Sequence, residues 1–190
     1  MVAGALLQES TTIWLNDELT YGPVNKPIVG KGCCYHPRDG SAWLSRSGLS
    51  ISKASGIEIY RAKDLFSDRS LWGVGGVLVH ELSHAYHDKF CKEGYDNTEV
   101  AQAYQSAMVQ GKYNCVSVHG SQGKNGPVKA YACANRMEFF AELSVAFMWK
   151  DDPVTEYNKW FPFNCSQLAE HDPATLRVLE KLWNEPYLVS

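Results

Sequence analysis

The alternation of hydrophobic and polar positions separates a β-rich first third of the chain from a helical remainder. Short stretches of β-branched, aromatic and aliphatic residues, bounded by Gly, Pro, Asn or Asp, predict strands at residues 11–15, 32–36, 41–45 and 56–61. Apolar and polar side chains alternate most clearly in Gly56–Arg61, so this strand should be half exposed. It is either a strand that offers its edge to an extended peptide or an ordinary outer strand.

Helical spacing of the apolar residues marks the later part of the chain. It predicts helices around residues 77–87, from a cap at Asn97 or Thr98 to Gly111, over residues 135–148 and over residues 173–183. The segment Gly111–Lys129 is rich in Gly, Ser, Asn and Lys, which predicts a mobile loop and a candidate lid.

Length and composition fit a single globular domain that covers residues 1–190. The apolar share of 45% and the charged share of 21% are typical of soluble proteins. A net charge of −3 without any basic run argues against nucleic acid as the main partner. No stretch reaches the roughly 18 consecutive apolar residues of a membrane span. The sequence leaves the oligomeric state open.

Six cysteines permit disulfides, with buried free thiols as the alternative. No two of them have CxxC spacing, which argues against a separate structural zinc site. The tripeptide Asn164-Cys165-Ser166 matches the glycosylation acceptor pattern. The compartment therefore stays open, with an inclination towards secretion.

The candidate chemistry begins in the first predicted helix, which contains the pattern HExxH at residues 80–84. His80 and His84 are one helical turn apart, so both imidazoles can reach one ion. Zinc binds such ligands readily, and Glu81 then stands where it can accept a proton from an activated water. The alternative is a core helix that contains two ordinary histidines.

The third predicted helix supplies candidates for the missing ligand, because it carries two glutamates among apolar residues. Glu138 and Glu142 are one turn apart, and an isolated carboxylate in an apolar interior is costly. If Glu138 binds the metal, Glu142 can accept a hydrogen bond from the outer nitrogen of a metal-bound histidine. Spacing alone also allows the reverse assignment, or two glutamates on a solvated face.

The segments His80–His84 and Tyr131–Glu142 closely resemble the catalytic domain of the anthrax lethal factor-like family of zinc metallopeptidases. In these endopeptidases of the gluzincin type, a tyrosine precedes the glutamate ligand by the spacing that separates Tyr131 from Glu138. The resemblance implies that His80, His84 and Glu138 bind zinc and that Glu81 is the general base. It further implies that Tyr131 assists the oxyanion and that Glu142 supports the ligands from behind.

The resemblance implies an α+β, zincin-like fold in which a small, mostly antiparallel sheet lies on the HExxH helix. Further helices would follow on the C-terminal side, with peptides or proteins as substrates. A metzincin is excluded because its third histidine position is occupied by Phe90. His87 and Asp88 are expected to be exposed or to lie beside the ligands without binding metal. The alternative function is a catalytically silent, zinc-containing module that binds a partner.

Overall fold

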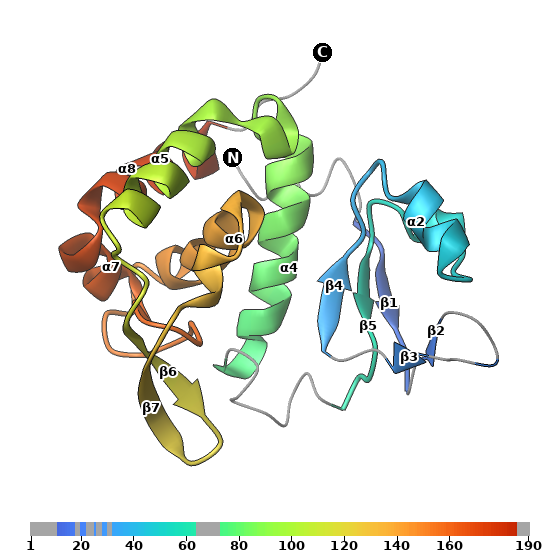
Figure 1. Ribbon diagram of the computed structural model, residues 1–190, viewed down its shortest axis with the longest axis horizontal. Helices are drawn as coiled ribbons and strands as arrows, with labels where there is room; N and C mark the ends of the chain where they lie inside the picture. Colours follow the sequence, from blue (N-terminus) through green and yellow to red (C-terminus); the bar gives the residue numbers. More distant parts are fainter. Residues whose placement is uncertain are drawn as a thin grey trace.

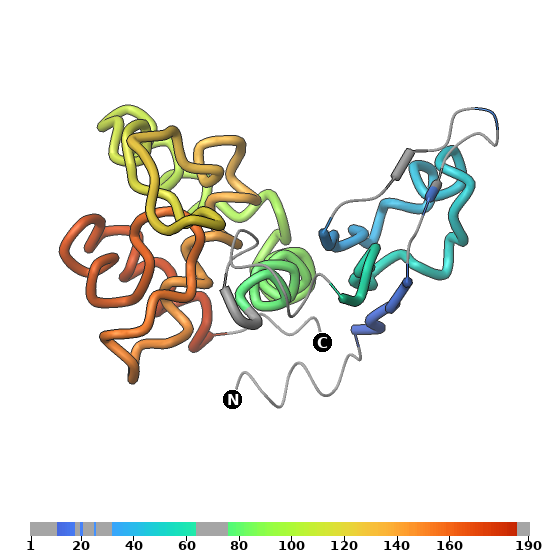
Figure 2. Tube along the Cα trace, turned by 90° about the horizontal axis from the view of Figure 1, so that it is seen from below, coloured from blue at the N-terminus to red at the C-terminus, as the bar shows by residue number. Residues whose placement is uncertain are grey.

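The computed structural model shows an α+β protein organised around the long helix α4 (Gly73–Phe90). In Figure 1 a small sheet lies on one side of α4, and the remaining long helices lie on the other. Figure 2, which looks along α4, shows the same two-sided arrangement. The structure describes residues 11–17, 20–21, 25, 28–29, 32–63 and 73–185.

The sheet on one side of α4 has the strand order β1 (Ile13–Leu15), β5 (Ile57–Ile59) and β4 (Cys33–Tyr35). β1 pairs with β5 in parallel, whereas β4 pairs with β5 antiparallel, so the predicted mostly antiparallel sheet is in fact mixed. β5 is the central strand, and all three of its residues are buried. The prediction that this strand is half exposed was therefore wrong, and the described strand with an open edge beside α4 is β4.

The predicted strand at residues 41–45 is instead a helix, α2 (Ser41–Arg46). The preceding turn closes with a bond from the Gly40 N–H to the Pro37 carbonyl, and the Leu44 N–H then continues the pattern to the Gly40 carbonyl. Leu44 is fully buried while Trp43 next to it is 41% exposed. The turn thus leads directly into helical bonds, and these outweigh the weak strand preference of the single aromatic residue, Trp43.

Smaller elements accompany this half of the molecule. β2 (Thr20–Tyr21) and β3 (Ile28–Val29) form an antiparallel pair. A 3-10 turn, η1 (Ile51–Lys53), follows α2 and leads towards β5.

The predicted later helices are confirmed, and the structure adds a short helix that the spacing did not reveal. Asparagine or aspartate caps the N-terminus of each, with a side-chain oxygen that accepts from a backbone N–H in the first turn. They are α5 (Thr98–Val109), α6 (Arg136–Met148), the unpredicted α7 (Cys165–His171) and α8 (Pro173–Asn184). Two 3-10 turns, η3 (Gly94–Asp96) and η4 (Tyr131–Cys133), precede α5 and α6.

The predicted loop at residues 111–129 is largely a β-hairpin. β6 (Val116–Gly120) pairs antiparallel with β7 (Gly123–Val128), and the turn pairs Gly120 with Gly123, whose φ of 110° favours glycine. Figure 1 shows the hairpin extending from the helical half of the molecule. Its polar strands gave no apolar alternation, which explains the failed prediction.

The main hydrophobic core lies between α4 and the C-terminal helices. Phe139, Phe140 and Phe147 of α6 are buried in it as expected, while Trp160 and Phe161 pack against it partly buried. Trp72, also expected in the core, lies outside the described residues. A second, smaller cluster joins β4 and β5 to α4. Within the described part of the chain, no helix has the length and apolarity needed to cross a membrane.

Candidate metal centre

Helix α4 places the two motif histidines side by side at the floor of a cleft. Both are buried, with exposed fractions of 2% for His80 and 8% for His84. Their Nε2 atoms lie 3.1 Å apart, as expected for residues one helical turn apart whose rings point the same way.

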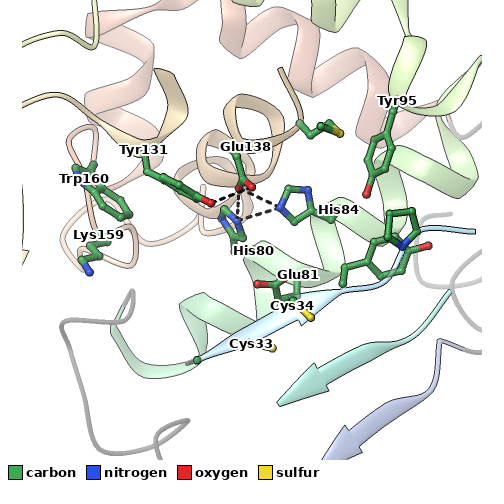
Figure 3. Close-up of a pocket in the computed structure, with 14 residues that line it drawn as sticks. Cys33, Cys34, His80, Glu81, His84, Tyr95, Tyr131, Glu138, Lys159 and Trp160 are labelled. Carbon is green, nitrogen blue, oxygen red and sulfur yellow. Dashed lines mark hydrogen bonds and ion pairs between the residues drawn. The ribbon is translucent and has the colours of Figure 1, made fainter. Parts of the chain in front are cut away.

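Helix α6 brings Glu138 to the same point from the other side. Its N-cap, Asn135, accepts hydrogen bonds from the N–H groups of Met137 and Glu138, both at 2.9 Å. The cap therefore fixes the backbone of Glu138 itself. The Oε2 atom of Glu138 lies 3.0 Å from His80 Nε2 and 3.2 Å from His84 Nε2 (Figure 3).

The spacing of these three atoms suits a zinc ion. Zinc lies about 2.0–2.1 Å from histidine nitrogens, so two ligand atoms of one tetrahedron are about 3.3 Å apart. The observed separations of 3.0–3.2 Å come close to that value. In the described residues, His80, His84 and Glu138 are the one group of three or more potential ligands close enough to share an ion.

The charges at this point also suit a cation. Burial alone would raise the pKa of Glu138, but hydrogen bonds from His80 and His84 outweigh it and hold the pKa well below its usual range. Burial would lower the pKa of His84, but its bond to Glu138 and the nearby Glu81 raise it. The carboxylate is therefore ionised, and the surroundings favour positive charge beside it.

The cleft above these residues has a volume of about 460 Å³. Glu81 lines it next to His80, although the side chain is mostly covered, at 5% exposed. β4 forms the opposite wall, with Cys33 and Cys34. Figure 3 shows Tyr95 at one end of the cleft, and Lys159 and Trp160 at the other.

Tyr131 extends into this cleft from η4. Its hydroxyl donates to the Oε1 atom of Glu138 at 3.0 Å, and the side chain is 40% exposed. Burial and the charge of Glu138 raise the pKa of Tyr131, so the hydroxyl keeps its proton and remains a donor. The structure thus brings together all the predicted site residues except Glu142: His80, Glu81, His84, Tyr131 and Glu138.

Glu142 departs from the prediction. It is fully buried, yet its oxygens make no hydrogen bond of good geometry with any described residue, so the expected bond to a histidine is absent. The N–H of Ala132 and the amide of Asn158 are its nearest donors, and burial raises its pKa to about 8. Glu142 therefore faces the Ala132 backbone of η4 and Asn158, which its spacing from Glu138 could not reveal.

His87 is buried in the core, contrary to the expectation that it is exposed or beside the ligands. It is fully buried, with its ring 4.6 Å from Phe140 and 5.1 Å from Tyr95 between centroids. Burial lowers the pKa of His87 to about 3, so it stays neutral. His87 thus packs between aromatic rings as part of the protein interior.

Asp88, also buried, connects α4 to the other wall of the cleft. One of its carboxylate oxygens accepts from the Tyr35 hydroxyl at 2.9 Å and from the Arg38 N–H at 3.0 Å. The other accepts from the Arg38 guanidinium at 3.1 Å. These bonds tie the end of β4 to the helix that carries the histidines.

A second polar cluster lies behind β4 and is centred on Glu58, which is fully buried. Its carboxylate accepts from Lys53, from His36 Nε2 at 2.9 Å and from Asn16 at 3.1 Å. Cys34 Sγ lies 3.6 Å from the same His36 nitrogen. A nucleophilic Cys–His–Glu arrangement needs two different ring nitrogens, and burial raises the pKa of Cys34 to about 12, so this cluster is structural.

The cysteines and the glycosylation pattern add no further site. All six cysteines are free thiols. Asn164 is 3% exposed, caps α7 and donates to the Pro153 carbonyl, so its side chain is engaged in the fold. The tripeptide therefore gives no support for secretion, which stays a prediction.

Sequence reasoning missed the two ends of the cleft. Tyr95 approaches His84 edge-on, with centroids 6.5 Å apart, and Trp160 stacks on Tyr131 at 5.6 Å. Neither residue has a short, fixed spacing from a motif residue that could have indicated this. Trp160 was expected mainly as a core residue, whereas it both packs on the core and lines the cleft.

Comparisons with family models, with curated proteins and with solved structures gave no match to this chain.

Proposed function

We propose that this protein is a zinc-dependent endopeptidase of zincin-like fold that hydrolyses peptide bonds with Glu81 as the general base. One observation carries the proposal. Two histidine nitrogens from α4 and a carboxylate oxygen from α6 converge within 3.2 Å of one another in a cleft that Glu81 also lines.

The arrangement of α4, α6 and the sheet supports the zincin-like part of the proposal. α4 carries the histidines between the sheet and the helical half, and α6 packs against it to deliver Glu138 (Figure 1). The cleft opens between these two halves, as a site for an extended chain requires.

The residues around the three ligands have the chemistry that peptide hydrolysis needs. Zinc held by His80, His84 and Glu138 would supply a Lewis acid that activates water at neutral pH. The Glu81 carboxylate would accept the proton from the attacking water and pass it to the leaving amine. The Tyr131 hydroxyl would donate to the oxyanion as it forms, a contribution often worth about 3 kcal/mol.

β4 offers a way to hold the peptide in place. It is the edge strand nearest the histidines, and its residues Cys33 and Cys34 line the cleft. An extended peptide that adds to this edge would gain main-chain hydrogen bonds largely independent of its sequence. In this proposal β4 has the peptide-binding role that was one of two alternatives for the strand at residues 56–61.

The decisive experiment combines zinc content with cleavage. Protein purified without added metal is measured by mass spectrometry, and an unfolded protein and a diverse peptide library are incubated with it, with and without a chelator. We expect about one zinc per chain, and cleavage that the chelator abolishes. The Glu81→Gln variant should keep its zinc and lose turnover by at least about 10²-fold.

Each other outcome has a definite meaning. A native protein that binds no zinc even when zinc is added would overturn the proposal. A zinc-containing native protein that cleaves no peptide would favour the alternative, a catalytically silent module that binds a partner. Full proteolytic activity in the Glu81→Gln variant would show that Glu81 is not the general base.

A further inference from the structure

The end of the cleft beyond Tyr131 is a rigid wall formed by residues 159–161. Trp160 forms an antiparallel bridge with Val118 of the hairpin. The His119 N–H donates to the Lys159 carbonyl at 2.8 Å, and the Phe161 N–H donates to the Ser117 carbonyl at 2.9 Å. These bonds attach the wall to β6 by an isolated β-bridge and the backbone bonds on either side of it.

The buried Asn158 holds the same wall from behind. Its amide donates to the carbonyls of Trp160 and Pro162, at 2.8 and 3.0 Å. The turn is thus braced internally by Asn158 and connected to the hairpin by its backbone. Side chains on such a wall have defined positions relative to the metal centre, which is what a specificity pocket requires.

Three side chains form a stack that leads from the metal centre to the rim of the cleft. The Trp160 ring stacks on Tyr131, and the Lys159 ammonium lies 4.9 Å from the Trp160 ring centroid. Figure 3 shows Lys159 and Trp160 together at this end. Of the described residues that line the cleft, Lys159 is the one lysine or arginine. The acidic side chains that line it are those of Glu81 and Glu138.

The direction of β4 decides which part of a peptide would reach this wall. Along the cleft in Figure 3, Cys33 lies nearer to Trp160 and Cys34 nearer to Tyr95, so β4 runs from the Trp160 end towards the Tyr95 end. A peptide that adds antiparallel to β4 runs the opposite way. Its residues after the cleaved bond therefore face Tyr131, Trp160 and Lys159.

We propose that Lys159 and Trp160 form a subsite for a carboxylate on the first few residues after the cleaved bond. The inference rests on the proposed peptidase function and names its substrate class. The carboxylate belongs either to an Asp or Glu side chain or to the C-terminus of a short peptide. Lys159 pairs with it, while the Trp160 ring packs against the adjoining aliphatic atoms.

The test compares cleavage profiles of the native protein and of Lys159→Glu, on a library that contains internal Asp and Glu as well as short peptides with free or amidated C-termini. The native protein should prefer a carboxylate after the cleaved bond by about tenfold. Lys159→Glu should lose this preference and favour Lys or Arg there. Enrichment of internal Asp or Glu identifies a side-chain carboxylate, and sensitivity to amidation identifies a C-terminal one.

A matched control and a second readout keep the subsite separate from catalysis. Lys150→Glu makes the same charge change at an exposed position outside the cleft, and its profile should match the native one. Peptide binding by zinc-loaded Glu81→Gln protein, with and without Lys159→Glu, measures the subsite without turnover. A carboxylate preference in binding without any cleavage by the native protein would overturn the peptidase and keep the subsite. Identical profiles and identical binding with Lys159 and with Glu at this position would overturn the subsite.

Discussion

Two glutamates of this protein form ion pairs with histidines, Glu58 behind the sheet and Glu138 in the cleft, and the two clusters offset the negative charge in different ways. Glu58 receives the Lys53 ammonium, His36 and the Asn16 amide, so a cation from the chain itself offsets its charge. Among the described residues, Glu138 forms its ion pairs with His80 and His84, and neither a lysine nor an arginine is part of its cluster.

The difference indicates which cluster is built for a ligand from outside. A buried carboxylate is stable only when paired, and the pairing of Glu58 is complete within the fold. Glu138 faces a cleft together with two nitrogens that also have lone pairs to offer. The Glu58 cluster thus stabilises the sheet, whereas the Glu138 cluster suits a metal ion.

The largest difference between the two clusters should be seen in zinc affinity when each glutamate is replaced. Glu138→Ala removes one of the three proposed ligand atoms, so zinc affinity should fall by about 10³-fold, more than the tenfold to hundredfold loss usual for an outer partner of a ligand. Glu58→Gln should leave zinc affinity unchanged. Competition with a chromophoric chelator measures both. Equal losses of zinc affinity in the two variants would contradict the division of roles.

The reverse should hold for stability. Glu58→Gln leaves the Lys53 ammonium buried without its counter-charge, and loss of one partner of such a pair costs about 3 kcal/mol of unfolding free energy. Urea denaturation of metal-free protein measures this. Glu138→Ala should lower the unfolding free energy less under the same conditions. It removes one negative charge from a metal-free cleft that the Glu81 carboxylate also lines.

The contribution of Glu58 to the unfolding free energy should be lost at low pH. Burial alone would raise the pKa of Glu58, but bonds from His36 and Lys53 lower it below its ordinary value of 4.5. A carboxylate with a lowered folded pKa contributes stability that is present above its unfolded pKa and lost as pH falls through its folded pKa. The stability difference between the native protein and Glu58→Gln should therefore be full at pH 7 and shrink progressively below about pH 4.5. A constant difference down to pH 2 would contradict this origin.

Tyr131→Phe should separate binding from turnover at the metal centre. Loss of its bond to Glu138 should weaken zinc binding by about tenfold at most, as for an outer partner of a ligand. Loss of the oxyanion donor should lower kcat by about 10²-fold. Steady-state kinetics at saturating zinc measures the second effect alone. An unchanged kcat would show that the hydroxyl serves only to orient Glu138.

Two matched helix caps give the smallest and most local test. Asn135 caps α6 next to Glu138, whereas Asn97 caps α5 by the same kind of bond away from the cleft. Replacement of either by Ala should cost about 1 kcal/mol of unfolding free energy. Only Asn135→Ala should also weaken zinc binding. Equal zinc affinities in the two variants would show that packing of α6, and not its cap, positions Glu138.

The convergence of His80, His84 and Glu138 could be predicted from sequence because its information is local. The pair His80 and His84 depends on one helical turn, and Asn135 sets the start of the helix that carries Glu138. Once both helices form, their apolar faces can pack in few ways. The same local reasoning failed for Glu142, whose surroundings depend on η4 and on Asn158, which is distant in sequence.

The sheet could be predicted less well because its partners are distant in sequence. The alternation at residues 56–61 indicated an exposed Glu58. In the interior, however, the Lys53 ammonium offsets its charge, and His36 and Asn16 form hydrogen bonds with it. Periodicity says which residues share a face and not which face is covered. The hairpin at residues 116–128 was missed for a related reason, since its polar strands depend on pairing with each other and with Trp160.

The bonds of Asp88 have a consequence for how this cleft can change over time. His80, His84 and Asp88 are spaced at successive intervals of four along α4, so one face of one helix supplies two candidate metal ligands and the attachment point of β4. A slip of the helix by a single residue would displace all of these together. Selection for zinc binding would then also preserve the width of the cleft. The wall of residues 159–161 is attached to a separate hairpin, so its residues could change between descendants and alter substrate preference without displacing the histidines.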